Sequence, residues 1–265
     1  MFDPAYRFLW HWLHRVDAHS LHSPLFFQFY NKVIRPKKVR PLPETVDSLI
    51  VQAKKDGRII NRNDLGAGSK AHGNEVTVAT LAKNSTSTRP VRQLLLNLTC
   101  WLNSDTILEL GTSLGFSALT MASARPEANL FTVEGCPQTA AIAQENFSKA
   151  AVSTIDLHVG NIDDILPDIL DQAGQIDLAY LDANHQYAPT LSYFDMIRPY
   201  LHSGSVVVIG DISWSKEMQR AWQEIKSRPE ATATADLLDV GVVFITPLPY
   251  RLSYAMAMPR ASVAR

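Results

Sequence analysis

Cysteine is scarce in this sequence, because Cys100 and Cys136 are its only two. Two cysteines form neither a disulfide framework nor a metal-binding spacing, which favours a reducing cytosolic setting. No apolar run reaches the roughly 18 residues of a membrane-spanning helix, and no charged-then-apolar signal segment is recognisable. The sequence therefore predicts a cytoplasmic protein without a membrane partner.

A strong net charge is also absent, since 25 Lys and Arg oppose 26 Asp and Glu over 265 residues. The charges are unevenly distributed: residues 1–70 carry 12 basic against 6 acidic side chains, and the remainder is acidic. The basic run from Arg35 to Arg40 stands beside prolines, which is typical of a solvated linker. Nucleic acid is therefore not the expected partner, and salt-sensitive RNA binding would revive that alternative.

Two common nucleotide motifs are missing, namely the Gly-x-Gly-x-x-Gly of dinucleotide sites and the Gly-Lys-Ser/Thr of triphosphate sites. Present instead is an apolar run that turns through Gly111 and Gly115 into a helical pattern from Phe116 onward. These glycines permit φ values that side chains forbid and let a ligand approach the backbone. A second apolar run ends at Glu134, where a carboxylate can meet ribose hydroxyls. The pattern favours a nucleoside ligand; a tight strand–helix turn without a ligand is the alternative.

A second glycine-rich segment, residues 64–69, imitates this turn. The preceding residues 58–63 are too polar and short for a central parallel strand, and no apolar helix follows. We interpret the segment as a mobile loop or lid near the active site.

From residue 105 onward, strand and helix patterns alternate. Strands are expected near residues 106–110, 129–133, 154–159, 176–181 and 205–210, with an antiparallel hairpin from 231–238 and 241–246. Such alternation predicts an α/β fold with a parallel sheet covered by helices on both faces.

Helical patterns dominate the part before residue 105. They cover residues 6–16, 23–34 (with Ser23 as cap and Pro24 first), 44–55, 75–83 and 91–102. We expect a helical extension over residues 1–90 and a second domain over 91–265. The aromatic residues of the first two helices are expected mainly in the core. These helices are compatible with two roles. They could line a pocket, in which case His11, His14, His19 and His22 would face the ligand, or they could form a homodimer contact.

The phrase LELGTSLGFS at residues 108–117 resembles the class I S-adenosylmethionine-dependent methyltransferases, in particular the O-methyltransferase branch of catechol O-methyltransferase. The resemblance covers roughly residues 90–246. Uncharacterised bacterial members of the family have segments similar to residues 22–34 (HSPLFFQFYNKVI) and 64–69 (DLGAGS). It implies a Rossmann-like sheet with a reversed final hairpin, S-adenosylmethionine as cofactor, and methyl transfer to a hydroxyl oxygen of a small-molecule acceptor.

The resemblance also implies roles for particular residues. It assigns the methionine side and the turn to Glu109, Gly111, Thr112, Ser113 and Gly115, the ribose to Glu134, the adenine to Asn161 and Ile162, and further cofactor contact to Asp182. From the residues alone, Glu109 at the end of its strand can face the crevice. For Asn161 or Asp163, the residues alone fit a cap of the next helix as well as they fit a contact with adenine.

Chemistry is expected where two neighbouring strands end. Asp182, Asn184, His185 and Tyr187 follow one strand on a single loop, and Asp211 follows the next strand. His185 is our candidate general base for a hydroxyl acceptor, with Asp182 and Asp211 as further catalytic residues. The two carboxylates could share a Mg²⁺ ion, as in catechol-type relatives, with His185 or Asn184 completing the shell.

Two positions depart from the relatives' pattern. Ile212 stands where catechol-type relatives have a ligating Asn, and Gly210 stands where others have a second acid. These departures put the metal in doubt and leave a catalytically silent cofactor-binding protein as an alternative. The second alternative is a methyltransferase that acts on RNA. The segment after residue 181 argues against it, because this segment lacks the Pro-Pro-aromatic signature of nitrogen-modifying relatives.

Overall fold

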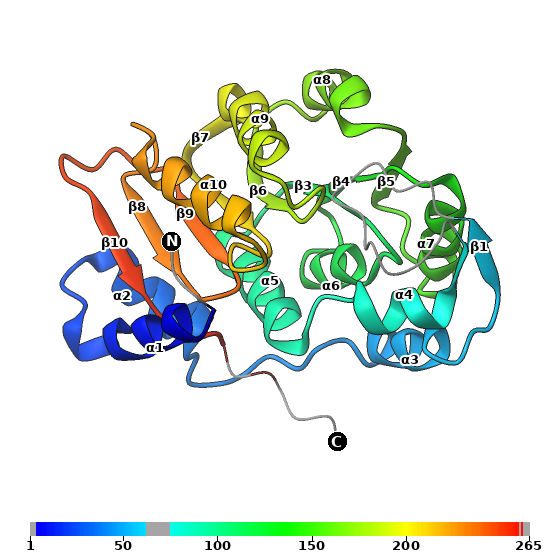
Figure 1. The fold of residues 1–265 in the computed structure, drawn as a ribbon, viewed down its shortest axis with the longest axis horizontal. Helices are drawn as coiled ribbons and strands as arrows, with labels where there is room; N and C mark the ends of the chain where they lie inside the picture. The colour runs from blue at the N-terminus through cyan, green and yellow to red at the C-terminus, as the bar shows by residue number, and fades with distance from the viewer. Residues whose placement is uncertain (1–3, 62–74, 260, 262–265) are drawn as a thin grey trace.

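The computed structural model describes residues 4–61, 75–259 and 261, and within them a central sheet of eight strands (Figure 1). Its order is β10-β8-β9-β7-β6-β3-β4-β5. The strands are β3 (Thr106–Leu110), β4 (Asn129–Glu134), β5 (Ile155–Val159), β6 (Ile176–Leu181), β7 (Leu201–Ile209), β8 (Ala233–Asp236), β9 (Gly241–Phe244) and β10 (Leu252–Ala255). Strands β3 to β7 pair in parallel, and β9 runs antiparallel to β7 and β8. The predicted α/β sheet and its reversed hairpin are confirmed, whereas the short edge strand β10 was not predicted.

Six helices of the described part cover the two faces of the sheet. They are α5 (Arg89–Leu102), α6 (Phe116–Ala124), α7 (Pro137–Lys149), α8 (Ile162–Ala173), α9 (Tyr187–Ile197) and α10 (Lys216–Ser227). Alternate strand residues point to opposite faces, so Ile107 packs in a core cluster with α5, α6 and α7, while Leu108 packs in another with α8, α9 and α10. This two-sided core holds the carboxyl ends of the parallel strands at one edge.

The first helices pack on the hairpin end of the sheet. They comprise α1 (Pro4–His14), the short turn Ala18–Ser20 and α2 (Pro24–Phe29) with its π-helical continuation Tyr30–Ile34. The next helix, α3 (Glu44–Ala53), lies at the other end of the molecule, in contact with α6 (Figure 1). Phe26 and Phe29 are fully buried, with ring centroids 5.5 and 5.0 Å from that of Phe244. Ser23 and Pro24 begin α2 as predicted, although the Ser23 side chain makes no capping hydrogen bond. One core cluster thus includes residues from both sides of position 90, and the division there stays a prediction.

The helix predicted from residue 75 is wrong at its start. Glu75–Thr77 is strand β2, which pairs antiparallel with β1 (Ile59–Asn61), and the helix α4 spans Val78–Asn84. The physical reason is a cap: the Thr77 side chain accepts a hydrogen bond from the Thr80 N–H at 3.2 Å. The glycine-rich segment 64–69 lies outside the described residues.

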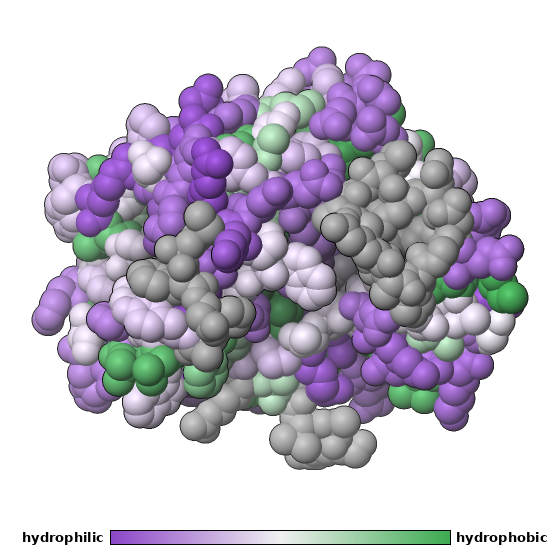
Figure 2. All heavy atoms as spheres, in the orientation of Figure 1, coloured by the Kyte–Doolittle hydropathy of each residue, from purple (hydrophilic) through white to green (hydrophobic). Residues whose placement is uncertain are grey.

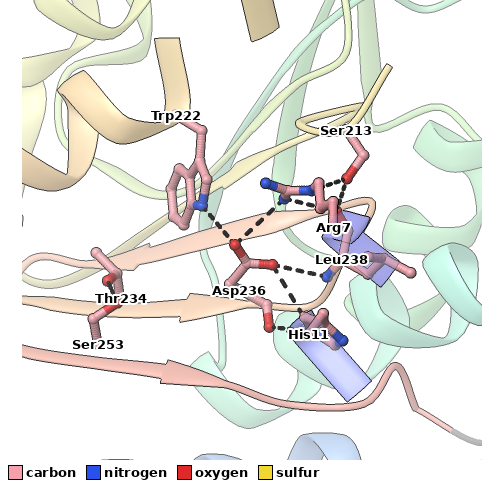
Figure 3. A network of polar contacts seen from close by, with 8 residues as sticks. All are labelled: Arg7, His11, Ser213, Trp222, Thr234, Asp236, Leu238 and Ser253. Carbon is pink, nitrogen blue, oxygen red and sulfur yellow. Dashed lines mark hydrogen bonds and ion pairs between the residues drawn. The ribbon is translucent and has the colours of Figure 1, made fainter. Parts of the chain in front are cut away.

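A buried polar network anchors α1 at the functional edge of the sheet (Figure 3). The Arg7 guanidinium donates to Ser213 Oγ (2.6 Å), to the Leu238 carbonyl (3.0 Å) and to Asp236 (3.4 Å). One turn later, His11 Nε2 lies 3.0 Å from the Asp236 carbonyl oxygen, and the indole N–H of Trp222 donates to the Asp236 carboxylate. Asp236 ends β8, so these contacts fix α1 beside the strand ends. The polar side of α1 therefore faces the protein.

Candidate active site

The turn after β3 requires its two glycines for reasons of packing. Gly111 and Gly115 have φ values of +102° and +81°. A Cβ on Gly111 would lie 2.4 Å from the Asp182 carbonyl oxygen, and one on Gly115 would lie 2.4 Å from the Phe147 ring. The first glycine thus lets β6 end directly beside the turn, which brings Asp182 next to the predicted cofactor loop.

Glu109 does not face an open crevice, contrary to the expectation from its place at the strand end. Its side chain is completely buried, and Glu109 Oε2 accepts a hydrogen bond of 2.6 Å from the Thr132 hydroxyl. The Thr112 and Thr132 hydroxyls are also 2.6 Å apart, so Thr112 too is turned inward. Burial raises the pKa of Glu109 to about 8. One sequence feature could have indicated these contacts, namely the hydroxyl residue Thr132 in the apolar interior of β4.

Glu134 holds the turn in place. It ends β4, next to β3, and its two carboxylate oxygens accept hydrogen bonds from the backbone N–H groups of Ser113 (2.8 Å) and Cys136 (3.0 Å). Ser113 itself has a φ of +49°. The carboxylate is partly exposed, at the edge where the strands end.

Asn161 and Ile162 lie at the start of α8. Asn161 is the N-cap, and its side chain accepts a hydrogen bond from the Asp163 N–H at 3.4 Å, which confirms the capping alternative. Ile162 is buried in the same core cluster as Val133. A role for either residue toward adenine stays a prediction.

The structure brings Asp182, His185 and Asp211 together. One ligand atom from each lies within 4.8 Å of the others, and His185 Nε2 is 3.7 Å from Asp211 Oδ2. The two acids follow β6 and β7, whose ends pair side by side, as expected. The Tyr180 hydroxyl donates to Asp182 at 2.7 Å. Burial and the nearby Asp182 carboxylate raise the pKa of Asp211, which His185 partly opposes.

The backbone around this cluster is strained. Asn184, His185 and Asp211 are non-glycine residues with φ values of +66°, +35° and +52°. Such conformations cost of order 1–3 kcal/mol each and gather at functional sites. The three strained residues therefore indicate that the cluster is a functional site and that its side chains are not close together by chance.

The two departures at positions 210 and 212 have structural causes. A Cβ on Gly210 would lie 2.2 Å from Asp182 Oδ1, so the Asp182 carboxylate occupies the space that any side chain would need. Ile212 is fully buried, and its N–H donates to the Asp239 carbonyl at 3.0 Å. Position 212 therefore belongs to the core. The remaining candidate cation ligands are Asp182, His185 and Asp211.

Comparison with known proteins identifies the region. Residues 108–212 match the model of a family described as a methyltransferase domain. Residues 108–212 are thus similar to methyltransferase domains, and we call this region the methyltransferase domain below. A catechol O-methyltransferase of Niastella koreensis is 35% identical over 109 residues, which are 40% of this chain and 48% of that protein. A probable O-methyltransferase of Mycobacterium tuberculosis is 34% identical over 113 residues, with the same coverage. The chain thus spans about half the length of these relatives.

Solved structures agree on the fold of the methyltransferase domain. An O-methyltransferase from Bacillus cereus in complex with SAH has a TM-score of 0.57 at 17% identity, covering 82% of this chain and 96% of that one. A methyltransferase of Podospora anserina bound to SAH has a TM-score of 0.61 at 16% identity, covering 79% and 91%. Among the described residues, no helix has the length and apolar character needed to cross a membrane.

A pocket of about 400 Å³ adjoins the cluster of the methyltransferase domain. It is lined by Arg7, Phe8, Asp211, Ser213, Trp214, Leu238 and Asp239. Trp214 is 72% exposed at this pocket. Burial and the neighbouring Asp211 raise the pKa of Asp239. The sequence did not single out Phe8 or Asp239, because only the fold brings α1 to this edge.

Tyr187, in contrast, is not part of the cluster. It begins α9, and its hydroxyl donates to Glu224 on α10. The Arg220 guanidinium lies over the Tyr187 ring at 4.1 Å. These contacts fix α9 to α10 and hold Tyr187 on that helix pair.

Proposed function

We propose that this chain transfers a methyl group from S-adenosylmethionine to a hydroxyl oxygen of a small aromatic molecule. The observation that carries the proposal is the Asp182–His185–Asp211 cluster, which lies directly beside the glycine turn of a methyltransferase domain. The curated relatives named as O-methyltransferases support the oxygen acceptor.

The residues of the cluster can carry the proton chemistry. When bound, S-adenosylmethionine supplies an electrophilic methyl group on a sulfonium. His185 Nε2 would accept the proton of the acceptor hydroxyl as the oxygen–methyl bond forms and the sulfur–methyl bond breaks, with S-adenosylhomocysteine as the leaving group. Asp211, 3.7 Å from that nitrogen, stabilises the resulting imidazolium. The Ser113 turn, held by Glu134, fixes the cofactor side, so alignment of the two reactants supplies most of the acceleration.

The same cluster fits a divalent cation. Two carboxylates and an imidazole offer ligand atoms within 4.8 Å of one another, and carboxylate oxygens are the donors that Mg²⁺ prefers. Asp182 and Asp211 would hold the ion, which would polarise an acceptor oxygen. Turnover with EDTA and with added Mg²⁺ measures this contribution.

Calorimetric titration of S-adenosylmethionine and S-adenosylhomocysteine tests the cofactor. We expect micromolar binding, weakened about 10- to 100-fold in Glu134→Gln, because charge-assisted hydrogen bonds are worth about 1.5–3 kcal/mol. Glu127→Gln, at an exposed acid between α6 and β4, is the matched control and should bind normally. Absence of binding by either nucleoside contradicts the proposal. Binding without turnover on any phenol would instead support the catalytically silent alternative.

The pocket beside the cluster is our proposed acceptor site. Phe8 and Trp214 offer aromatic surface, and Asp211 belongs both to the pocket and to the cluster. In Trp214→Ala we expect KM for a catechol probe to rise about tenfold with little change in kcat, because lost stacking weakens ground-state binding. Tyr250→Ala, at an exposed aromatic residue outside the pocket lining, should leave KM unchanged. An unaltered KM in Trp214→Ala would place the acceptor elsewhere.

A further inference from the structure

Helix α1 turns its apolar side chains outward. Six large residues are between 41% and 61% exposed: Tyr6, Phe8, Leu9, Trp10, Trp12 and Leu13. Figure 2 shows hydrophobic residues at the lower left, where α1 and α2 lie in Figure 1. Scattered exposed apolar residues are common, but a contiguous patch on one short helix marks an interaction site.

The inward side of the same helix is polar. Arg7 and His11, four residues apart, face the protein and contact Asp236 (Figure 3). The helix therefore has the reverse of the usual amphipathic arrangement, in which the apolar stripe faces the core. Because Asp236 fixes this orientation from the protein interior, the outward position of the apolar face follows from the fold itself.

The charge of the surrounding segment indicates what covers this face. Residues 1–40 contain seven Lys or Arg and two Asp, whereas the rest of the chain carries a net negative charge. Five of these seven cations lie at residues 32–40, and this basic segment attracts an anionic surface. A cationic group also borders the apolar patch, since the Arg15 guanidinium is 5.8 Å from the Trp12 ring centroid.

We propose that α1 docks in the surface of an anionic lipid membrane. Its tryptophan and tyrosine side chains belong to the types that prefer the membrane–water interface, and flanking cations add attraction to anionic headgroups. At 11 residues the helix is too short to span a bilayer and fits an orientation in the plane of the interface. The sequence predicted no membrane partner, and our proposal departs from that prediction for surface contact alone.

Docking has a consequence for the pocket beside the cluster. Phe8 belongs both to the outward face of α1 and to the pocket lining. Docking would therefore place the mouth of the pocket against the lipid, where a lipid-soluble phenol could enter. This consequence rests on the proposed function, whereas the docking of α1 does not.

Sedimentation of the full chain with vesicles tests the docking. We expect binding to phosphatidylcholine vesicles that contain phosphatidylglycerol, and weaker binding to phosphatidylcholine alone or in high salt. Two apolar side chains each contribute about 1.5–3 kcal/mol when buried, so Trp12→Ser/Leu13→Ser should lower partitioning by at least about tenfold. Bilayers of brominated lipid should quench the fluorescence of Trp10 and Trp12.

The matched control is Val51→Ser/Ile59→Ser. These residues are 53% and 66% exposed, against 51% and 61% for Trp12 and Leu13, and lie on α3 and β1 at the opposite end of the molecule (Figure 1). Equal thermal midpoints and equal affinity for S-adenosylhomocysteine before and after substitution show that both variants are folded. Three results would overturn the proposal: no binding to anionic vesicles, equal loss in both variants, or a dimer in light scattering that only the α1 variant abolishes. Loss of methyl transfer without loss of vesicle binding bears on the proposed function alone.

Discussion

Replacing His185 with alanine is expected to lower kcat for methyl transfer by about 10²- to 10³-fold, because a positioned general base contributes roughly that much. His185 is the one imidazole that the described cluster contains, and it lies 3.7 Å from Asp211. Asp211→Asn should lower kcat less, by about tenfold, since the amide keeps the size of the side chain but not its charge. Single-turnover rates at saturating S-adenosylmethionine measure both effects.

The control is a second histidine–aspartate pair on the same sheet. His202 Nε2 lies 2.9 Å from Asp177 Oδ1, at the edge where the parallel strands begin. His202→Ala removes a comparable contact far from the cluster and should leave kcat unchanged. Full activity in His185→Ala, or an equal loss in His202→Ala, would remove His185 from the chemistry. Cofactor affinity, measured in parallel, should be preserved in both variants.

Parallel strands made part of this site predictable. Consecutive strands that pair in parallel end at a common edge, so acids directly after two such strands must lie near each other. Asp182 and Asp211 follow this rule, and the sequence therefore placed them correctly. His185 could be added because only two residues separate it from Asp182.

Other features depend on contacts between segments far apart in the chain. Asp236 anchors α1 across more than 220 positions, and no local pattern in either segment indicates that pairing. The aromatic pattern of residues 6–16 predicted a helix but suggested that its apolar face is buried. The polar network reverses that face, which periodicity alone cannot reveal.

The glycine at position 210 shows a different limit. In the sequence it looked like the loss of a ligand. In the structure, Gly210 leaves room for the Asp182 carboxylate, since a Cβ would approach Asp182 Oδ1 to 2.2 Å. A missing side chain can thus be required by the ligand residue of the neighbouring strand.

The buried carboxyl of Glu109 should make the stability of the ligand-free protein fall as pH rises. Its pKa is about 8 in the folded protein, against a usual value of 4.5. Between these values the folded state keeps a proton that the unfolded state releases, so the free energy of unfolding decreases from about pH 4.5 to about pH 8. The stabilising effect of the neutral form is complete below the lower value and lost above the higher one.

Glu109→Gln should remove this dependence, because the amide is neutral at every pH and its oxygen can still accept the Thr132 hydroxyl hydrogen bond. Relative to the unaltered protein, we expect little pH-dependent gain in the free energy of unfolding near pH 4.5 and a gain of up to about 5 kcal/mol near pH 9, at 1.36 kcal/mol per pKa unit. Urea unfolding across this range measures the difference, with Glu127→Gln as the exposed control. Any fixed cost of burying the amide shifts the whole curve, so the slope is the decisive quantity. Parallel curves for Glu109→Gln and the unaltered protein would mean that Glu109 is ionised in the fold, with a charge held beneath the cofactor turn.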